Sequence, residues 1–159
     1  MTSALAKQVL DRALAVHATI TTAESCTGGM VAAAITDHEG SSAVFERGFV
    51  TYSNAAKTDL LDVKSETLQS VGAVSEEVAG EMAKGAKAAA GATVAVSITG
   101  IAGPGGSEHK PEGRVCFGLA YGDIVKTETR EFGAIGRDRV RAASTDHALE
   151  LLLNGLRHG

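Results

Sequence analysis

The sequence contains few aromatic residues and almost no proline. Its 159 residues include no tryptophan, two tyrosines and four phenylalanines, so a core has to be built from alanine, valine, leucine and isoleucine. Two prolines against 19 glycines indicate tight turns and close backbone approaches rather than a disordered linker. This length is typical of one domain with a buried core, and we expect residues 1–159 to form a single domain.

Cysteine pairs, a basic surface and long apolar runs are missing as well. Cys26 and Cys116 are far apart and lack C-x-x-C spacing, which favours reduced cytosolic thiols over a disulfide framework. A net charge of -4 argues against a nucleic-acid partner. No apolar run approaches the roughly 18 residues that cross a membrane, and the first twenty residues do not resemble a signal peptide. We therefore expect a cytoplasmic protein with no membrane partner.

Hydrophobic periodicity and turn residues predict elements in the order α-β-α-β-α-α-β-β-β-α. Ser53 and Ser75 are the expected N-caps of two helices, and Gly122-Asp123 is the expected turn of a hairpin. The predicted helices cover 3–17, 27–37, 54–63, a segment after Ser75 and a segment after Gly136; the predicted strands cover 19–25, 45–53, 93–98, 114–122 and 124–132. This order predicts a three-layer α/β/α sandwich with a mixed, partly antiparallel sheet.

Three side chains with nucleophilic groups follow the first predicted strand, in the stretch "TTAESCTGG". Cys26 carries the better intrinsic nucleophile, but a thiolate needs a nearby histidine, and none of the five histidines lies in an obvious catalytic turn. Buried structural cysteine is the favoured interpretation of Cys26. Thr27 is expected to cap the next helix or to line the site. Ser25 remains, and its hydroxyl needs a base.

The neighbours of Ser25 suggest how its turn is built. Gly28 and Gly29 are expected in the first turn of the next helix, where unpaired backbone N–H groups stabilise an oxyanion or bind an anion. Glu24 is expected to line the site and to fix the turn. The plain alternative is that Gly28-Gly29 is only a tight turn.

A candidate base follows the second predicted strand, in "TYSNAAKTDLL". Lys57 lies five residues after Tyr52, about one turn into a helix, and both side chains converge on Ser25 if the two strands are neighbours. Burial turns a lysine into a general base, and Ser-Lys pairs are a known variant of the catalytic triad. Tyr52 is expected to relay a proton or to orient the lysine. The alternative is a solvated lysine and a packed tyrosine.

A second loop, "SITGIAGPGGSEHK", follows the third parallel strand. Gly100, Gly103 and Gly105 give its backbone the freedom to wrap an anionic or ribose-bearing ligand, and Thr99 offers a hydroxyl at the strand end. The loop lacks the GK[ST] ending of a P-loop and the G-x-G-x-x-G order of a dinucleotide fingerprint. A nucleotide-binding role and a purely structural role therefore both stay open for this loop.

The segments "TTAESCTGG", "GSSAVFERGFVTYSNAAKTDLL", "GAVSEEVA" and "VSITGIAGPGGSEHKPEGRV" resemble successive signature blocks of the CinA C-terminal domain family. Members include single-domain nicotinamide-nucleotide amidohydrolases. The resemblance implies hydrolysis of the carboxamide of nicotinamide mononucleotide (NMN), a pyridine nucleotide, to nicotinate mononucleotide and ammonia. It also implies Ser25 as nucleophile with Lys57 and Tyr52 as partners, no metal or organic cofactor, and, by analogy, a homo-oligomer.

A substrate with a phosphate group needs a cationic partner. Arg137 and Arg141 are four residues apart near the start of the last predicted helix, where cations oppose the helix dipole unless an anion is close. We therefore predict that the two arginines bind the phosphate. Two alternatives also account for these arginines: a solvated helix face, or salt bridges to another subunit.

Two other functions use the same loops. One is a non-catalytic nucleotide-binding or regulatory module of competence or damage response, in which Lys57 is an ordinary surface charge. The other is an amidase whose nucleophile is Cys26.

Overall fold

The computed structural model of the chain describes residues 1–107 and 109–158, and within these ranges five strands form one mixed sheet. The strand order is β2-β1-β3-β4-β5. The strands are β1 (Ile20–Glu24), β2 (Phe49–Val50), β3 (Val94–Gly100), β4 (Arg114–Tyr121) and β5 (Ile124–Glu131). β1 pairs in parallel with β2 and β3, whereas β4 pairs antiparallel with β3 and β5. The mixed sheet expected from the sequence is confirmed.

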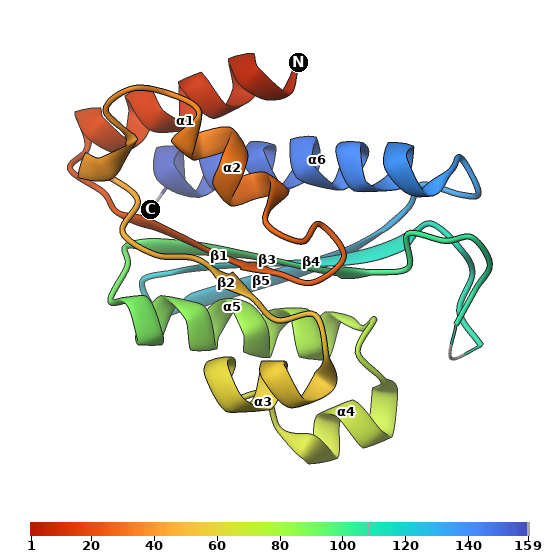
Figure 1. Cartoon of the computed structure of the whole chain (residues 1–159). Helices are drawn as coiled ribbons and strands as arrows, with labels where there is room; N and C mark the ends of the chain where they lie inside the picture. Colours follow the sequence, from red (N-terminus) through yellow and green to blue (C-terminus); the bar gives the residue numbers. More distant parts are fainter. Residues whose placement is uncertain (108, 159) are drawn as a thin grey trace.

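Helices cover both faces of this sheet (Figure 1). On one face lie α1 (Thr2–Ala15), α2 (Met30–Thr36) and α6 (Arg137–His158); on the other lie α3 (Asn54–Leu61), α4 (Ser65–Val71) and α5 (Glu76–Ala90). A short 3-10 helix, η1 (Ser41–Ala43), leads into β2. The three-layer sandwich is thus confirmed, although α4 was not expected and β2 is much shorter than the predicted strand 45–53.

Local capping chemistry sets the starts of two helices as predicted. The Ser53 hydroxyl accepts from the Ala56 N–H at 3.0 Å and begins α3. The Ser75 hydroxyl accepts from the Val78 N–H at 3.2 Å and begins α5. The predicted hairpin is also present, because β4 and β5 are joined through Gly122 and Asp123.

The two faces of β3 carry different residue sizes. Val94, Val96 and Ile98 point into the large apolar cluster shared with α1 and α6. Ala95 and Ser97 face α5, where the Ser97 hydroxyl donates to the Ala79 carbonyl. Small residues on this side let α5 approach the sheet closely, and the alternation fixes the register of the strand.

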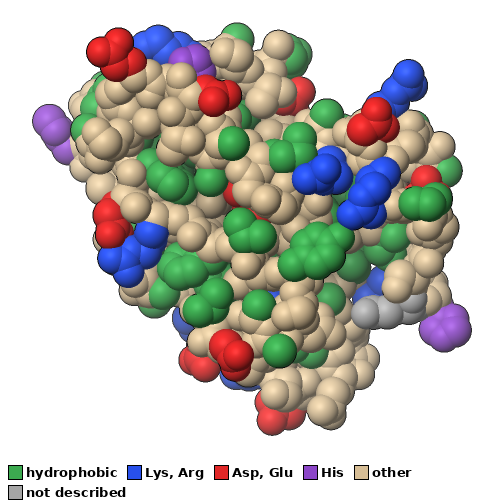
Figure 2. Space-filling view, in the orientation of Figure 1, with side chains coloured by type: hydrophobic (Ala, Val, Ile, Leu, Met, Phe, Trp, Pro, Cys, Tyr) green, Lys and Arg blue, Asp and Glu red, His purple; other side chains and the backbone are tan. Residues whose placement is uncertain are grey.

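The chain crosses from one side of β1 to the other, because β2 and β3 flank it. In α/β sheets such a switch point creates a crevice at the carboxyl ends of the parallel strands. On the face of the molecule seen in Figure 2, charged side chains lie mainly near the rim and apolar side chains lie nearer the centre. Across the described ranges, the helices are all too short or too polar to pass through a lipid bilayer.

Candidate functional site

Ser25 lies directly after β1, at the switch point. Its backbone N–H donates to the Ile98 carbonyl on β3 at 2.9 Å, which holds the residue against the neighbouring strand. The side chain is buried, with only 8% of the residue exposed. The sheet therefore presents the hydroxyl to a sheltered crevice rather than to bulk water.

Lys57 reaches Ser25 from α3. The amine Nζ is 3.1 Å from Ser25 Oγ, 3.0 Å from the Thr51 carbonyl oxygen and 3.2 Å from the Tyr52 carbonyl oxygen. The residue is 1% exposed, so the alternative of a solvated surface lysine is wrong. Lys57 reaches Ser25 as expected, because β1 and β2 are neighbours, with Glu24 paired to Val50. The expectation that the Tyr52 side chain also converges on Ser25 is wrong.

Tyr52 contributes its backbone to this cluster, and its phenol lies elsewhere. The phenol accepts from Arg137 Nη2 at 2.9 Å, and 60% of the residue is exposed. The carbonyl, by contrast, is one of the oxygens around the Lys57 amine. The sequence anticipated that Tyr52 meets Lys57, but it did not anticipate that the contact is through the main chain.

Glu24 holds the beginning of α2, although it belongs to β1. Oε1 accepts from the Thr27 hydroxyl and from the N–H groups of Gly29 and Val31, while Oε2 accepts from the N–H of Ala32. This buried carboxylate thus neutralises the helix start that the sequence suggested for an anionic ligand. It does fix the turn, as expected.

This arrangement corrects three details of the predicted loop. The helix begins at Met30 rather than at 27, so Gly28 and Gly29 lie in the preceding turn with φ of 58° and 109°. Their N–H groups donate to the Ser25 carbonyl and to Glu24, so neither is unpaired. Thr27 does not cap α2, because its hydroxyl donates to Glu24.

Two other N–H groups in the same turn have no such partner. Within the described part of the chain, the Thr27 N–H donates to no residue, and the Cys26 N–H contacts only the thiol of its own side chain. They are the two peptide groups that directly follow the Ser25 hydroxyl. Successive N–H groups in a turn form a small anion-binding concavity, so an oxyanion at Ser25 has donors here.

Cys26 is ill suited to be the nucleophile. Burial raises the pKa of its thiol to about 11 from an ordinary 9.0, and the Glu24 carboxylate adds to the rise while Arg141 and Lys57 oppose it. Only the thiolate is nucleophilic, so the thiol is almost entirely inactive at neutral pH.

We predict that Cys26 resists alkylation in the native protein. With a pKa of about 11, on the order of a thousandth of the thiol is ionised at pH 8, and burial hinders the reagent further. Mass spectrometry after iodoacetamide treatment should find the Cys26 peptide unmodified in buffer and modified in urea. Rapid labelling of Cys26 in the folded protein at pH 8 would instead support Cys26 as the nucleophile.

The second loop folds back on itself through residues that the sequence did not single out. Glu112 accepts from the Gly105 N–H at 2.6 Å. Gly103 has φ 91°, and a Cβ there would lie 2.6 Å from the Glu112 carboxyl carbon, so only glycine fits. Lys110 donates to the carbonyls of Val71 and Val74, tying the loop to the segment before α5. Residue 108 of this loop lies outside the described residues.

A cavity of about 270 Å³ lies between the two loops. Ser25, Lys57 and Tyr52 line one side, and Thr99 and Gly100 line the other. The Thr99 hydroxyl donates to the Ala73 carbonyl at 2.9 Å and so braces this wall. The Ser25–Lys57 pair, Cys26 of the following turn and the end of β3 are therefore gathered at one cavity.

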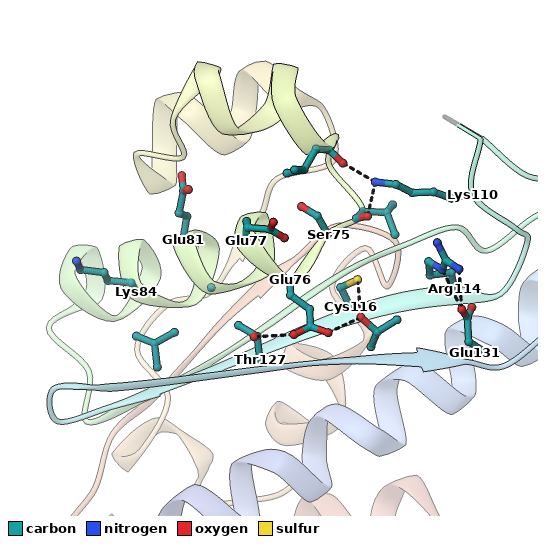
Figure 3. A pocket seen from close by; sticks show the side chains of 15 residues that line it. Ser75, Glu76, Glu77, Glu81, Lys84, Lys110, Arg114, Cys116, Thr127 and Glu131 are labelled. Atoms are coloured by element: carbon teal, nitrogen blue, oxygen red, sulfur yellow. Dashed lines mark hydrogen bonds and ion pairs between the residues drawn. The ribbon is translucent and has the colours of Figure 1, made fainter.

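A larger groove of about 880 Å³ lies between α5 and the outer strands (Figure 3). Some of its charged side chains have partners within the protein: Glu76 accepts from Thr127 and Thr129, and Arg114 pairs with Glu131. The groove is larger, but the Ser25–Lys57 pair lines the smaller cavity, which is therefore the candidate active site. Over the described residues, no His, Cys, Asp and Glu side chains gather into a metal-binding group of three.

Arg137 and Arg141 are not equivalent, contrary to the prediction from their spacing. Arg137 donates to the Gly103 carbonyl at 2.8 Å as well as to the Tyr52 phenol, and so it bridges the second loop and the rim of the cavity. Arg141 donates to the carbonyls of Cys26 and Thr27. Arg137 therefore contacts the side chain of Tyr52, which lines the cavity, whereas Arg141 contacts the backbone of the turn after Ser25.

The fold and the site define a class of protein: a three-layer α/β/α sandwich with a buried serine-lysine pair at the switch point of its sheet. The model of the CinA C-terminal domain matches residues 2–156, and the chain belongs to this family.

The relatives of the chain agree with this assignment. It is 56% identical over 149 residues to the nicotinamide-nucleotide amidohydrolase PncC of Escherichia coli K12, covering 93% of this chain and 90% of that protein. A crystal structure of a CinA superfamily protein from Klebsiella pneumoniae is 36% identical with a TM-score of 0.96, covering 100% of this chain and 99% of that one. The competence/damage inducible protein CihA of Agrobacterium tumefaciens is 44% identical with a TM-score of 0.94, covering 97% and 94%.

Proposed function

We propose that the protein hydrolyses the carboxamide of NMN, releasing nicotinate mononucleotide and ammonia. The observation that carries the proposal is the 3.1 Å contact between Lys57 Nζ and Ser25 Oγ inside a buried cavity. The name of the Escherichia coli relative, a nicotinamide-nucleotide amidohydrolase, supports the substrate class.

The partners of Lys57 include one group that can give up a proton to the amine. The carbonyl oxygens of Thr51 and Tyr52 only accept hydrogen bonds, whereas the Ser25 hydroxyl donates or accepts. A neutral amine has two N–H groups for the two carbonyls and one lone pair for the hydroxyl. In the proposed mechanism the amine is neutral when Ser25 attacks, because only a neutral amine has a lone pair for the Ser25 proton.

The reaction then proceeds through an acyl-enzyme. Ser25 Oγ attacks the amide carbon while its proton passes to Lys57, and the N–H groups of Cys26 and Thr27 receive the developing oxyanion. The C–N bond breaks, and the ammonium of Lys57 returns the proton to the leaving nitrogen. Water then attacks the ester carbon while its proton passes to Lys57. The bond between the acyl carbon and Ser25 Oγ breaks, and Lys57 returns the proton to Ser25 Oγ. In this scheme the Tyr52 carbonyl orients the lysine, and no metal takes part.

Ammonia release from NMN by the wild-type protein is the direct test. A coupled glutamate dehydrogenase assay measures the ammonia, and chromatography identifies nicotinate mononucleotide. Binding of NMN in calorimetry without any release of ammonia would instead indicate the non-catalytic nucleotide-binding module.

Arg137 is the proposed partner of the substrate phosphate, and its removal is expected to weaken binding. Arg137→Ala should raise KM for NMN by about tenfold while kcat changes little, because the guanidinium stands at the rim rather than at Ser25. Arg139→Ala, an exposed neighbour, is the matched control. Nicotinamide riboside, which lacks the phosphate, should show no such difference; equal effects on both substrates would contradict the assignment.

A further inference from the structure

Arg141 holds the back of the turn that carries Ser25. Its Nε donates to the Cys26 carbonyl at 3.0 Å, and its Nη2 donates to the Thr27 carbonyl at 3.4 Å. A Cβ on Gly28 would lie 3.4 Å from Nη2, so the guanidinium packs closely over the turn. One residue of α6 thus holds the Cys26–Thr27 and Thr27–Gly28 peptide units of this turn.

The position of this cation calls for an explanation. Arg141 lies one turn into α6, where the helix dipole opposes positive charge. Among the described residues it forms no ion pair with a carboxylate. Its side chain donates to the two turn carbonyls, so it binds the backbone beside Ser25 rather than an acidic neighbour.

The contact with the Cys26 carbonyl acts on the Thr27 N–H, because the two groups belong to the same peptide unit. In a trans peptide the C=O and the N–H point in opposite directions, so a guanidinium on the Cys26 carbonyl leaves the Thr27 N–H directed away from it. A charged donor on a carbonyl also polarises that peptide unit and makes its N–H a stronger donor. The same grip keeps the turn from rotating, which preserves the direction of both N–H groups.

We propose that Arg141 is a positioning residue for catalysis: it orients and polarises the Cys26–Thr27 peptide so that the turn amides stabilise the oxyanion formed at Ser25. This inference rests on the proposed function for its substrate, and on the observed contacts for its geometry. It replaces the phosphate-binding role that the sequence spacing suggested for Arg141.

The test compares Arg141→Lys and Arg141→Ala with the exposed control Arg139→Ala. Loss of one oxyanion donor costs about 10²–10³ in kcat, so Arg141→Ala should lose roughly tenfold to a hundredfold, with KM for NMN unchanged. Lysine keeps the charge but not the two-pronged contact, so Arg141→Lys should also lose activity. Added guanidinium ion should restore part of kcat to Arg141→Ala, an effect that a folding defect would not show.

The outcomes separate the alternatives. A raised KM with unchanged kcat would overturn the proposal in favour of contact with the substrate. Wild-type activity in Arg141→Lys would overturn the claim that the two contacts of a guanidinium are required. A kcat loss without guanidinium rescue, accompanied by a large fall in Tm, would mean a purely structural role.

A second measurement does not depend on NMN. A fluorophosphonate labels an activated serine through an oxyanion-like intermediate, and mass spectrometry follows its attachment to Ser25. Labelling that slows in both Arg141 variants and not in Arg139→Ala supports the inference even if NMN proves not to be the substrate. Labelling at wild-type rates in both Arg141 variants would overturn it whatever the substrate is.

Discussion

Ser25→Ala is expected to abolish ammonia release from NMN. In serine hydrolases the loss of the nucleophile removes the covalent route and lowers kcat by about 10⁴–10⁶-fold. Here the hydroxyl is the group in contact with the Lys57 amine, and the neighbouring thiol of Cys26 is held protonated, so no other group replaces it. Initial rates at saturating NMN, measured beside the wild type, give the size of the loss.

Cys26→Ala is the matched control, because it removes the adjacent nucleophilic atom and leaves Ser25 in place. This variant should keep activity near that of the wild type, and both proteins should bind NMN in calorimetry. The opposite pattern, with an active Ser25→Ala and an inactive Cys26→Ala, would move the nucleophile to the thiol. Loss of activity in neither variant would mean that the chemistry lies outside this turn.

Those features that depend on short-range rules were predictable from the sequence. The hydroxyls of Ser53 and Ser75 each bind an N–H three residues further along the chain, and the hairpin at Gly122-Asp123 is a two-residue turn. Lys57 was expected about one helical turn after the second strand. Its approach to Ser25 then followed from the assumption that the first and second strands are neighbours. Each of these requires only local geometry and one pairing.

Contacts between distant parts of the chain were not predictable in the same way. Glu24 lies in a strand, but its carboxylate caps the start of a helix, a pattern unlike a capping box. For this reason the Gly29 N–H, which the sequence suggested for an oxyanion, is already hydrogen-bonded. Arg137 and Arg141 share a helix face in the sequence, but the loops packed against that face give them separate partners. Their partners are set by tertiary packing, which helical spacing does not encode.

The same distinction explains Tyr52. The sequence correctly placed the Tyr52 backbone near Lys57, because the chain has to pass that point to begin α3. The direction of its phenol depends on Arg137, which is 85 residues further along the chain. Sequence spacing therefore located the backbone and left the side chain undetermined.

Lys57→Met is expected to remove most of the activity without removing the cavity. Methionine has a similar length and no amine, so the variant lacks the base while the apolar stem remains packed in α3. General-base catalysis contributes about 10²–10⁴-fold, and kcat should fall by that amount with NMN still bound in calorimetry.

Lys57→Arg separates a base from a fixed positive charge. Guanidinium donates to carbonyl oxygens such as those of Thr51 and Tyr52, but it stays protonated in proteins and accepts no proton. An inactive, folded Lys57→Arg that still binds NMN therefore identifies proton transfer as the function of the amine. Substantial turnover by this variant would instead show that a positive charge beside Ser25 suffices, and the serine would need another base.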